Sequence, residues 1–296
     1  MNLFGIMERF STHENCINYL EEIRWDDEPK CPHCESENVA RKREGGKIGR
    51  WNCHLCKSSF SVLSGTLFSR SKIPLPKWFM AIGLMSNAKK SLSSCQLARH
   101  LGLNQMSAWA MMQKIRTEME RKGETLLKGI IEADECYLGG KPRRRRNEDG
   151  EMPPPPKRGR GTHKTPILAA IERGGKVIAK VATDLTKNGI LTFIQKFVKT
   201  DQSVLITDEY KSYQVIDDQS IMPHSTVNHG EKEYAHGIIH TNTIEGFWSM
   251  LKRAFHGTHH HYSKKYTPLY LAEACYKWNN RKRRKLFERF IRECFV

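Results

Sequence analysis

Two Cys-x-x-Cys pairs are the feature that most restricts how this chain folds. Cys31 and Cys34 form the first pair, eighteen residues follow, and Cys53 and Cys56 form the second. Four thiolates on two adjacent turns complete the tetrahedron that Zn²⁺ prefers, and they leave no open position for catalysis. The spacing therefore predicts a small structural zinc site, in preference to two pairs of ordinary buried thiols.

The segments around these pairs predict a β ribbon preceded by a helix. Residues 38–43 and 47–52 have strand character and flank a Gly45-Gly46 turn, and residues 59–63 form a third short strand. Residues 1–29 place apolar side chains at roughly helical spacing, which predicts a short amphipathic helix.

The remaining cysteines and the knuckle histidines show no metal-ligand spacing. His33 and His54 lie inside the knuckles and are alternative zinc ligands, although such residues more often face solvent. The odd total of nine cysteines argues against a disulfide framework. We therefore expect buried, reduced thiols at the other five positions: Cys16, Cys95, Cys136, Cys275 and Cys294.

A helical region follows at residues 72–121. Its segments 94–101 and 105–119 have the pattern of a helix-turn-helix, in which Gly102 allows the turn. Within the second helix, one apolar face is predicted to be buried: Ala108, Met111, Met112 and Ile115. Gln113, Lys114 and Arg116 are then expected to point outward and to contact DNA.

From Gly129 onward the pattern becomes that of a mixed α/β domain. The predicted strands are 130–138, 165–171, 176–183 and 203–207, and the predicted helices are 189–198, 243–255 and 269–278. A basic, proline-rich insertion at residues 141–164 separates the first two strands, and its composition supports no packed core.

The overall charge indicates a polyanionic partner. The chain has 49 Lys and Arg against 32 Asp and Glu, a net charge of +17, which favours nucleic acid. The sequence contains neither an apolar run long enough to span a bilayer nor a secretory signal. These features predict a cytoplasmic, DNA-bound protein, or a nuclear one in a eukaryote.

Three acidic residues stand out by their context. Asp134 lies in a predicted strand, Asp208 ends the apolar run at residues 204–207, and Glu245 lies near the start of an amphipathic helix. A carboxylate at the end of a buried strand must be solvated or bound, so metal coordination is a reasonable use. Each acid taken alone is more often a surface or capping residue.

The chain resembles bacterial insertion-sequence transposases that carry a zinc ribbon before an ISXO-type catalytic domain, a group related to Merlin elements. The resemblance extends from about Arg24 to Asn280. It depends on the two cysteine pairs and on three motifs, EADECYLGGK at 132–141, TDEYKSY at 207–213 and HTNTIEGFWSMLKR at 240–253. It implies a ribonuclease H-like mixed-sheet fold, a DDE site formed by Asp134, Asp208 and Glu245, and cut-and-paste transposition with Mg²⁺ or Mn²⁺.

Two of the three acids have alternatives. Some relatives use Asn as the third residue, and Asn242 lies three residues before Glu245 on nearly the same helical face. Glu245 is favoured because carboxylate is the harder ligand, and because Lys252 follows two helical turns later, where it is positioned to hold a DNA phosphate. Glu132 shares a strand face with Asp134, but the motif selects Asp134.

The complete hypothesis is a DNA transposase with three parts: a ribbon at 1–66, a helix-turn-helix region at 67–126 and a catalytic domain at 127–296. The first two bind the terminal inverted repeats, and Lys252 and Arg253 also contact DNA. The resemblance further implies a homodimer or larger assembly on transposon ends and target DNA. The alternatives are a non-catalytic zinc-ribbon regulator, a simple metal-dependent nuclease, or a decayed or domesticated transposase.

Two further basic segments are expected to have no metal-binding or catalytic role. His256, His259, His260 and His261 show no ligand spacing and are expected in a solvated loop near the DNA backbone. Residues 281–285 are predicted to be a solvated or phosphate-contacting helix face.

Overall fold

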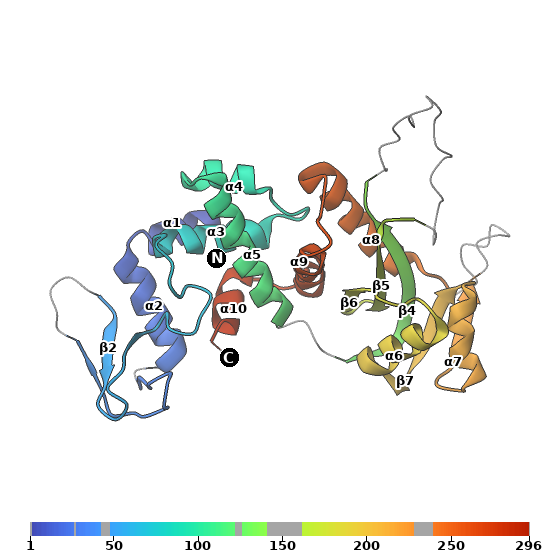
Figure 1. Ribbon diagram of the computed structural model, residues 1–296, viewed down its shortest axis with the longest axis horizontal. Coiled ribbons are helices and arrows are strands. Elements are labelled where there is room, and N and C mark those ends of the chain that lie inside the picture. Colours follow the sequence, from blue (N-terminus) through green and yellow to red (C-terminus); the bar gives the residue numbers. More distant parts are fainter. Residues whose placement is uncertain are drawn as a thin grey trace, which may run out of the picture. The chain divides into compact units, whose positions relative to one another are not determined.

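The computed structural model describes residues 2–26, 28–42, 48–121, 126–140, 162–227 and 239–295. The chain divides into two compact units (Figure 1). One comprises residues 1–122 and 282–296, and the other comprises residues 123–281. The predicted Gly45-Gly46 turn and most of the insertion at 141–164 lie outside the described residues. None of the helices within these ranges combines the length and the apolar character needed to cross a bilayer.

The first unit begins with two helices where the sequence predicted one. Helix α1 spans Leu3–Arg9 and α2 spans His13–Trp25. The break occurs because Thr12 caps α2: its hydroxyl accepts a hydrogen bond from the Asn15 backbone N–H at 3.1 Å. A three-stranded antiparallel ribbon follows in the order β1 (Val39–Arg41), β2 (Arg50–Cys53) and β3 (Ser59–Ser61), in agreement with the predicted hairpin and third strand.

Helices α3 (Leu75–Asn87), α4 (Ser94–Leu101) and α5 (Gln105–Arg121) complete most of this unit. The turn between α4 and α5 is the one expected, because Gly102 adopts a φ of 57°, a left-handed conformation that glycine adopts at low cost. Asn104 then accepts a bond from the Ser107 N–H at 2.7 Å and caps α5. The predicted apolar face of α5 is buried as expected: Ala108, Met111, Met112 and Ile115.

The last helix, α10 (Leu286–Glu293), packs in the same unit. Its Phe287 ring lies 5.4 Å from that of Phe79 on α3, which in turn lies 4.9 Å from Phe10. The domain limits 1–66, 67–126 and 127–296 stay a prediction. The packing adds that the C-terminal helix shares an aromatic core with the N-terminal helices.

The second unit contains a five-stranded mixed sheet in the order β6-β5-β4-β7-β8. Its strands are β4 (Leu127–Leu138), β5 (Thr165–Glu172), β6 (Val177–Val181), β7 (Val198–Asp208) and β8 (His224–Val227). Strands β4, β5 and β6 pair antiparallel, while β7 runs parallel to β4 and β8 parallel to β7. Three antiparallel strands followed by two that are parallel to the first define the ribonuclease H-like fold, and the predicted fold class is confirmed.

Helices cover both faces of this sheet (Figure 1). Helix α6 (Lys187–Phe197), the 3₁₀ turn η2 (Lys211–Tyr213) and α7 (Gln214–Asp218) pack on the face that includes Ile131 and Ala133. Helices α8 (Asn242–Ala254) and α9 (Thr267–Asn280) pack on the face that includes Cys136 and Leu138, and a single π turn, η4 (Phe255–His259), extends α8. The alternation along β4 therefore directs Glu132 and Asp134 toward α8.

Candidate functional sites

The four knuckle cysteines form one cluster in the ribbon. Their sulfur atoms all lie within 4.8 Å of one another, and the Cys31–Cys56 and Cys34–Cys53 Sγ pairs are each 3.6 Å apart. A Zn–S bond of ~2.3 Å in a tetrahedron requires sulfur atoms roughly 3.8 Å apart. The thiols are therefore already placed as zinc requires. The predicted structural zinc site has its complete ligand set, with Cys31 and Cys53 buried beside Phe60.

The sheet brings the first two predicted acids together. Ala133 pairs with Thr207 in the parallel ladder, so the next residues, Asp134 and Asp208, lie side by side where β7 ends. Their oxygens form a cluster with that of Glu135, all within 4.8 Å. The Tyr210 backbone N–H donates to Asp208 Oδ1 at 3.1 Å and holds this carboxylate at the strand end.

Asp134 lies in an unusual electrostatic environment. Burial raises the pKa of its carboxyl to about 6, and the neighbouring Asp208 carboxylate acts in the same direction. Three groups oppose the rise in pKa: Trp248 Nε1 donates to Oδ2 at 2.9 Å, the Glu135 N–H donates to Oδ1 at 2.7 Å, and the Lys252 charge is nearby. Two close carboxylates without a counter-cation are destabilising, and a bound cation would relieve this.

Helix α8 supplies the third predicted acid to the lining of a hollow of about 540 Å³. Asp134 and Glu245 both line it, together with Trp248, Ser249, Lys252, Arg253 and His256. Residues 245, 248, 249, 252 and 256 recur at helical spacing, so one face of α8 and its π extension forms the wall. Glu245 and Lys252 thus share a face, as their two-turn spacing predicts.

The acidic cluster in the structure differs in one residue from the set that the sequence predicted. Asp134, Glu135 and Asp208 each place a carboxylate oxygen within 4.8 Å of the other two. Glu245 is not a member of that cluster. Glu245 is exposed near the start of α8, where it lines the same hollow as Asp134. Asn242 is the first residue of α8, is also exposed, and does not line the hollow.

Sequence reasoning missed two residues near the acids, Trp248 and Glu135, and considered a third, Glu132, only as an alternative to Asp134. Trp248 holds the Asp134 carboxylate, Glu135 joins the acidic cluster, and Glu132 binds the start of α8. Glu132 and Glu135 were visible beside Asp134 in the sequence, but their different partners depend on which face of β4 each occupies. The indole of Trp248 gave no signal, because an aromatic residue on an amphipathic helix usually indicates a core.

Two of the three residues predicted to point outward from α5 do not. Gln113 and Arg116 are 7% and 1% exposed, so the prediction of an outward orientation is wrong for both. Helix α5 packs against both α3 and α4, and this buries most of its circumference. Lys114 is exposed as predicted, with its ammonium 3.4 Å from the Ser69 carbonyl oxygen. The side chains exposed beside it are those of Gln105, Met106, Ala110 and Thr117.

The remaining cysteines are mostly buried, as expected. Cys16, Cys136 and Cys275 are buried, Cys294 is half-buried, and Cys95 is exposed, which corrects the prediction for that residue. Burial raises the pKa of Cys275 to about 12 and that of Cys136 to about 11, so these thiols stay protonated at neutral pH.

The basic segments at 256–261 and 281–285 contribute no metal-ligand set, and residues 281–285 are not helical, so the prediction of a helix face there is wrong. In the described part of the chain, the groups of potential metal ligands are the two already given, and neither includes a histidine. His259 instead packs edge-on against Tyr270 at 4.8 Å. Arg281 stacks on Trp278 at 4.3 Å and donates to the Gly175 carbonyl at 3.0 Å, so it supports the β5–β6 turn.

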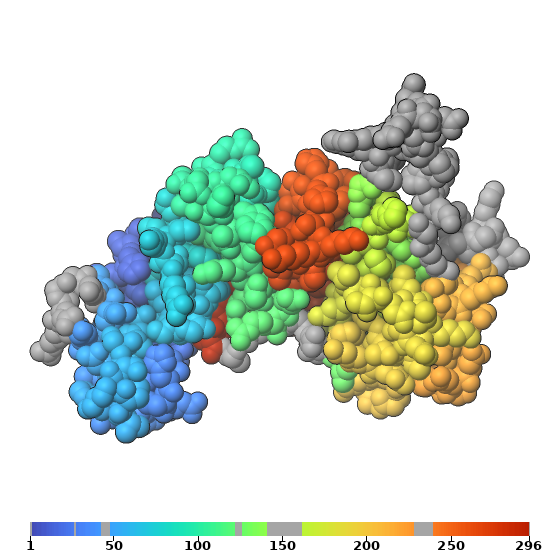
Figure 2. All heavy atoms as spheres, in the orientation of Figure 1, coloured from blue at the N-terminus to red at the C-terminus, as the bar shows by residue number. Residues whose placement is uncertain are grey.

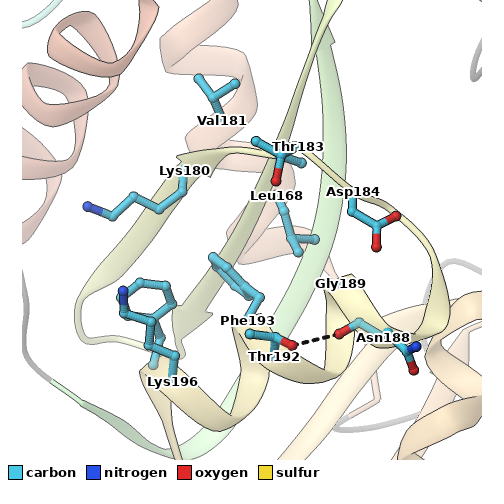
Figure 3. Close-up of a pocket in the computed structure, with 12 residues that line it drawn as sticks. Leu168, Lys180, Val181, Thr183, Asp184, Asn188, Gly189, Thr192, Phe193 and Lys196 are labelled. Atoms are coloured by element: carbon cyan, nitrogen blue, oxygen red, sulfur yellow. Dashed lines mark hydrogen bonds between the residues drawn. The ribbon is translucent and has the colours of Figure 1, made fainter.

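A second hollow, of about 510 Å³, lies between β6 and α6 (Figure 3). Asp184 is the acid among its lining residues, and hydrogen bonds from Thr186 lower the pKa of that carboxyl. Lys180 and Lys196 place their ammonium groups 5.9 and 5.2 Å from the Phe197 ring centre. A single exposed acid beside two lysines does not make a divalent-cation site, so the chemistry belongs to the first hollow.

The ribonuclease H-like sheet with adjacent acids at its strand ends defines the structural class of this protein. Within that class, this chain belongs to the ISXO2-like transposase domain family, which matches residues 126–279, slightly more than half of the chain. A transposase zinc-ribbon domain matches residues 11–59. The family predicted from the motifs is therefore confirmed, and so is the zinc ribbon.

Three comparisons describe what else this chain is similar to. A Halobacterium salinarum protein described as an uncharacterized protein in transposable element ISH50 is 28% identical over 255 residues, which are 83% of this chain and 84% of that protein. The Mos1 strand transfer complex has 14% identity and a TM-score of 0.29, with 72% and 75% of the two chains covered. A mariner Mos1 paired end complex with Mg has 13% identity and a TM-score of 0.30, with 99% and 93% covered. Scores this low carry no structural conclusion, so the fold assignment rests on the strand order.

Proposed function

We propose that the protein is a DNA transposase that binds the terminal inverted repeats of an insertion sequence and catalyses strand cleavage and strand transfer. The observation that carries this proposal is the side-by-side placement of Asp134 and Asp208 at adjacent strand ends, with Glu245 and Lys252 across one hollow. Membership of a transposase family makes DNA the substrate that fits these residues best.

The acids are suited to hold Mg²⁺ or Mn²⁺. Carboxylate oxygens are the ligands that these hard cations prefer, and Asp134 and Asp208 each place one within 4.8 Å of the other. Bound there, divalent ions would activate a water or a 3′-hydroxyl and stabilise the leaving oxygen in phosphoryl transfer. Glu245 would complete the set from α8, and it is preferred to Asn242 because it lines the hollow.

Other residues around the hollow would bind and orient DNA. Lys252 and Arg253 project from the wall that faces Asp134, where their charges suit the phosphates on either side of the reacting bond. Trp248 fixes the Asp134 carboxylate through its indole N–H. In the proposed sequence of reactions, a strand is hydrolysed at each transposon end, and the freed 3′-hydroxyl then attacks target DNA, with no covalent protein intermediate.

The first unit would recognise the transposon ends. Helices α4 and α5 (green in Figure 2) form a helix-turn-helix, and the N-terminal part of the second helix in such a motif enters the major groove. Because Gln113 and Arg116 are buried, the DNA-contacting residues are assigned to the exposed stripe of α5: Gln105, Met106, Ala110 and Lys114. The zinc ribbon would add contacts, and a homodimer or larger assembly would hold two ends together.

The experiment that tests this function is a strand-transfer assay with Asp134→Asn on DNA that carries the element's ends. The variant should lose cleavage and joining by at least about 1000-fold, because a neutral amide does not replace a metal-binding carboxylate. End binding should change little. Asp201→Asn is the matched control, since Asp201 is an exposed acid on the same strand as Asp208.

The outcomes separate the alternatives. Full activity of Asp134→Asn would exclude a catalytic role for this site and leave a DNA-binding regulator. Cleavage without joining in the unmodified protein would identify a simple nuclease, since only a transposase joins the freed end to a target.

A further inference from the structure

The start of helix α8 is capped by a residue from another element. Its own N-cap residue, Thr241, makes no side-chain hydrogen bond to the helix. The free N–H groups of Thr243 and Ile244 donate instead to Glu132 Oε2, at 2.8 and 3.0 Å. Glu132 lies on β4, more than a hundred residues earlier in the chain. A carboxylate at this position satisfies the free donors and the positive end of the helix dipole.

The same carboxylate is held from its other side. Its Oε1 atom accepts bonds from the Thr243 hydroxyl at 2.8 Å and from Arg173 Nε at 2.9 Å. Arg173 also donates to the His240 carbonyl at 2.9 Å, so it fixes the residues that lead into α8. Glu132 has no exposed surface. Both of its carboxylate oxygens are therefore engaged by donors of the protein itself.

A second bond joins the same strand and helix further along. Trp248 Nε1 donates to Asp134 Oδ2 at 2.9 Å. Glu132 and Asp134 are two residues apart on a strand, about 7 Å. Ile244 and Trp248 are four residues apart on a helix, about 6 Å. The two spacings match, so α8 is attached to β4 at two points, and Glu245 lies between them.

We propose that Glu132 is a positioning residue that sets the location of Glu245 relative to Asp134, an inference that rests on the proposed function. The two acids come from different elements, and the apolar packing of α8 on the sheet is not directional, so the hydrogen bonds of its first turn help to fix its position along β4. Glu132 provides that hold together with Arg173. Its loss would widen the separation of the acids while leaving the acids themselves intact.

The test is the Mn²⁺ affinity of zinc-loaded, full-length Glu132→Gln, measured by electron paramagnetic resonance in the absence of DNA. The Gln amide has a single acceptor oxygen, so if that oxygen serves the Thr243 and Ile244 N–H groups its NH₂ group faces the Arg173 Nε–H donor. Glu132→Gln therefore breaks one side of the bridge and removes the negative charge from the first turn of α8. Mn²⁺ affinity should fall by about 10- to 100-fold, as is typical when a group that orients metal ligands is removed. The Mg²⁺ concentration for half-maximal strand cleavage should rise by a similar factor, with DNA-end affinity unchanged.

Glu273→Gln is the matched control. Glu273 is also a buried acid of the second unit, 2% exposed and paired with Lys277, but it lies on α9, away from the start of α8. This variant should lower thermal stability and keep the Mn²⁺ affinity of the unmodified protein. If both variants lose Mn²⁺ affinity to the same degree, Glu132 has only a general structural role and the inference is wrong.

A milder variant covers the case in which Glu132→Gln does not fold. Thr243→Val removes one donor to Glu132 and keeps the carboxylate, so Mn²⁺ affinity should fall by a smaller factor in the same direction. If neither variant changes the Mn²⁺ affinity, the inference is overturned. Failure of the proposed function has a different signature: the unmodified protein would then bind Mn²⁺ no better than Asp134→Asn.

Discussion

At the scale of single residues, burial and a neighbouring charge set the chemistry of Asp134. Its carboxyl has a pKa of about 6, mainly because burial disfavours the charged form, with Asp208 adding to the effect. In the unfolded chain the same group has a pKa near ~3.9. Without a bound cation, the Asp134 carboxyl therefore stays protonated to a higher pH in the folded protein than in the unfolded chain.

This shift makes a prediction about stability and pH. Since the folded pKa is raised, the contribution of Asp134 to stability is complete below about pH 4, declines between about pH 4 and 6, and is lower by about 3 kcal/mol above that range. In magnesium-free, zinc-loaded protein, Asp134→Asn should therefore slow hydrogen exchange in β4 at pH 8 and leave it unchanged at pH 4. Mass spectrometry of peptides from residues 127–138 measures this effect.

Added Mg²⁺ provides the internal control. The ion should stabilise β4 in the unmodified protein at pH 8 and have no effect on Asp134→Asn. Equal protection of the two proteins at pH 8 without Mg²⁺ would show that the carboxyl is not destabilised by its surroundings.

At the scale of elements, the ribbon depends on its metal more than on its core. The buried members of its cluster are Cys31, Cys53 and Phe60, with Trp25 and Trp51 packed beside them. A core of this size supplies little free energy of folding, so the four thiolates and their ion must supply much of it.

Loss of one thiolate should therefore unfold the ribbon selectively. Cys53→Ser should reduce bound zinc from one ion per chain to near zero, measured by elemental analysis, and weaken end binding by at least about 10-fold. Cys95→Ser is the control, because Cys95 is an exposed thiol outside the ribbon. A Cys53→Ser protein that retained stoichiometric zinc would disprove the four-thiolate assignment.

Helix α5 shows what a helical pattern predicts and what it does not. The spacing of Ala108, Met111, Met112 and Ile115 correctly identified a buried face. It did not reveal that Gln113 and Arg116 are buried too, because the width of the covered face depends on how many helices pack around α5. Polar residues at its margin were assigned to solvent, and the neighbouring helices α3 and α4 decided otherwise.

At the scale of the whole molecule, the charge of +17 should dominate affinity for DNA. Binding to transposon ends should weaken steeply with salt, and Lys114→Ala should reduce the slope of log affinity against log salt by about 1 if Lys114 contacts one phosphate. Fluorescence anisotropy across a salt series measures the slope. Lys187→Ala is the control, since Lys187 is paired with Asp218 on the surface of the second unit. An unchanged slope for Lys114→Ala would remove α5 from the DNA interface.

What the sequence alone determined was set by short-range spacing. The zinc ligands are three residues apart within each pair, the turn at Gly102 depends on one residue, and Glu245 and Lys252 share a face because a helix repeats every ~3.6 residues. The strand pattern predicted a mixed α/β domain, and the family resemblance carried by the motifs implied the ribonuclease H-like fold, which the strand order confirms. For each cysteine pair, the Gly102 turn and the face of α8, the chemical signal and the geometry lie within one short segment.

Only the tertiary structure decided the contacts between distant elements. Parallel pairing of β4 with β7 places Asp208 beside Asp134, and the packing of α8 on the sheet gives Glu132 its partners at Thr243 and Ile244. A buried carboxylate accepts hydrogen bonds from the donors that the fold places next to it. For this reason Glu132 appeared in the sequence only as an alternative to Asp134, and its bonds to the start of α8 became visible once strand and helix were in contact.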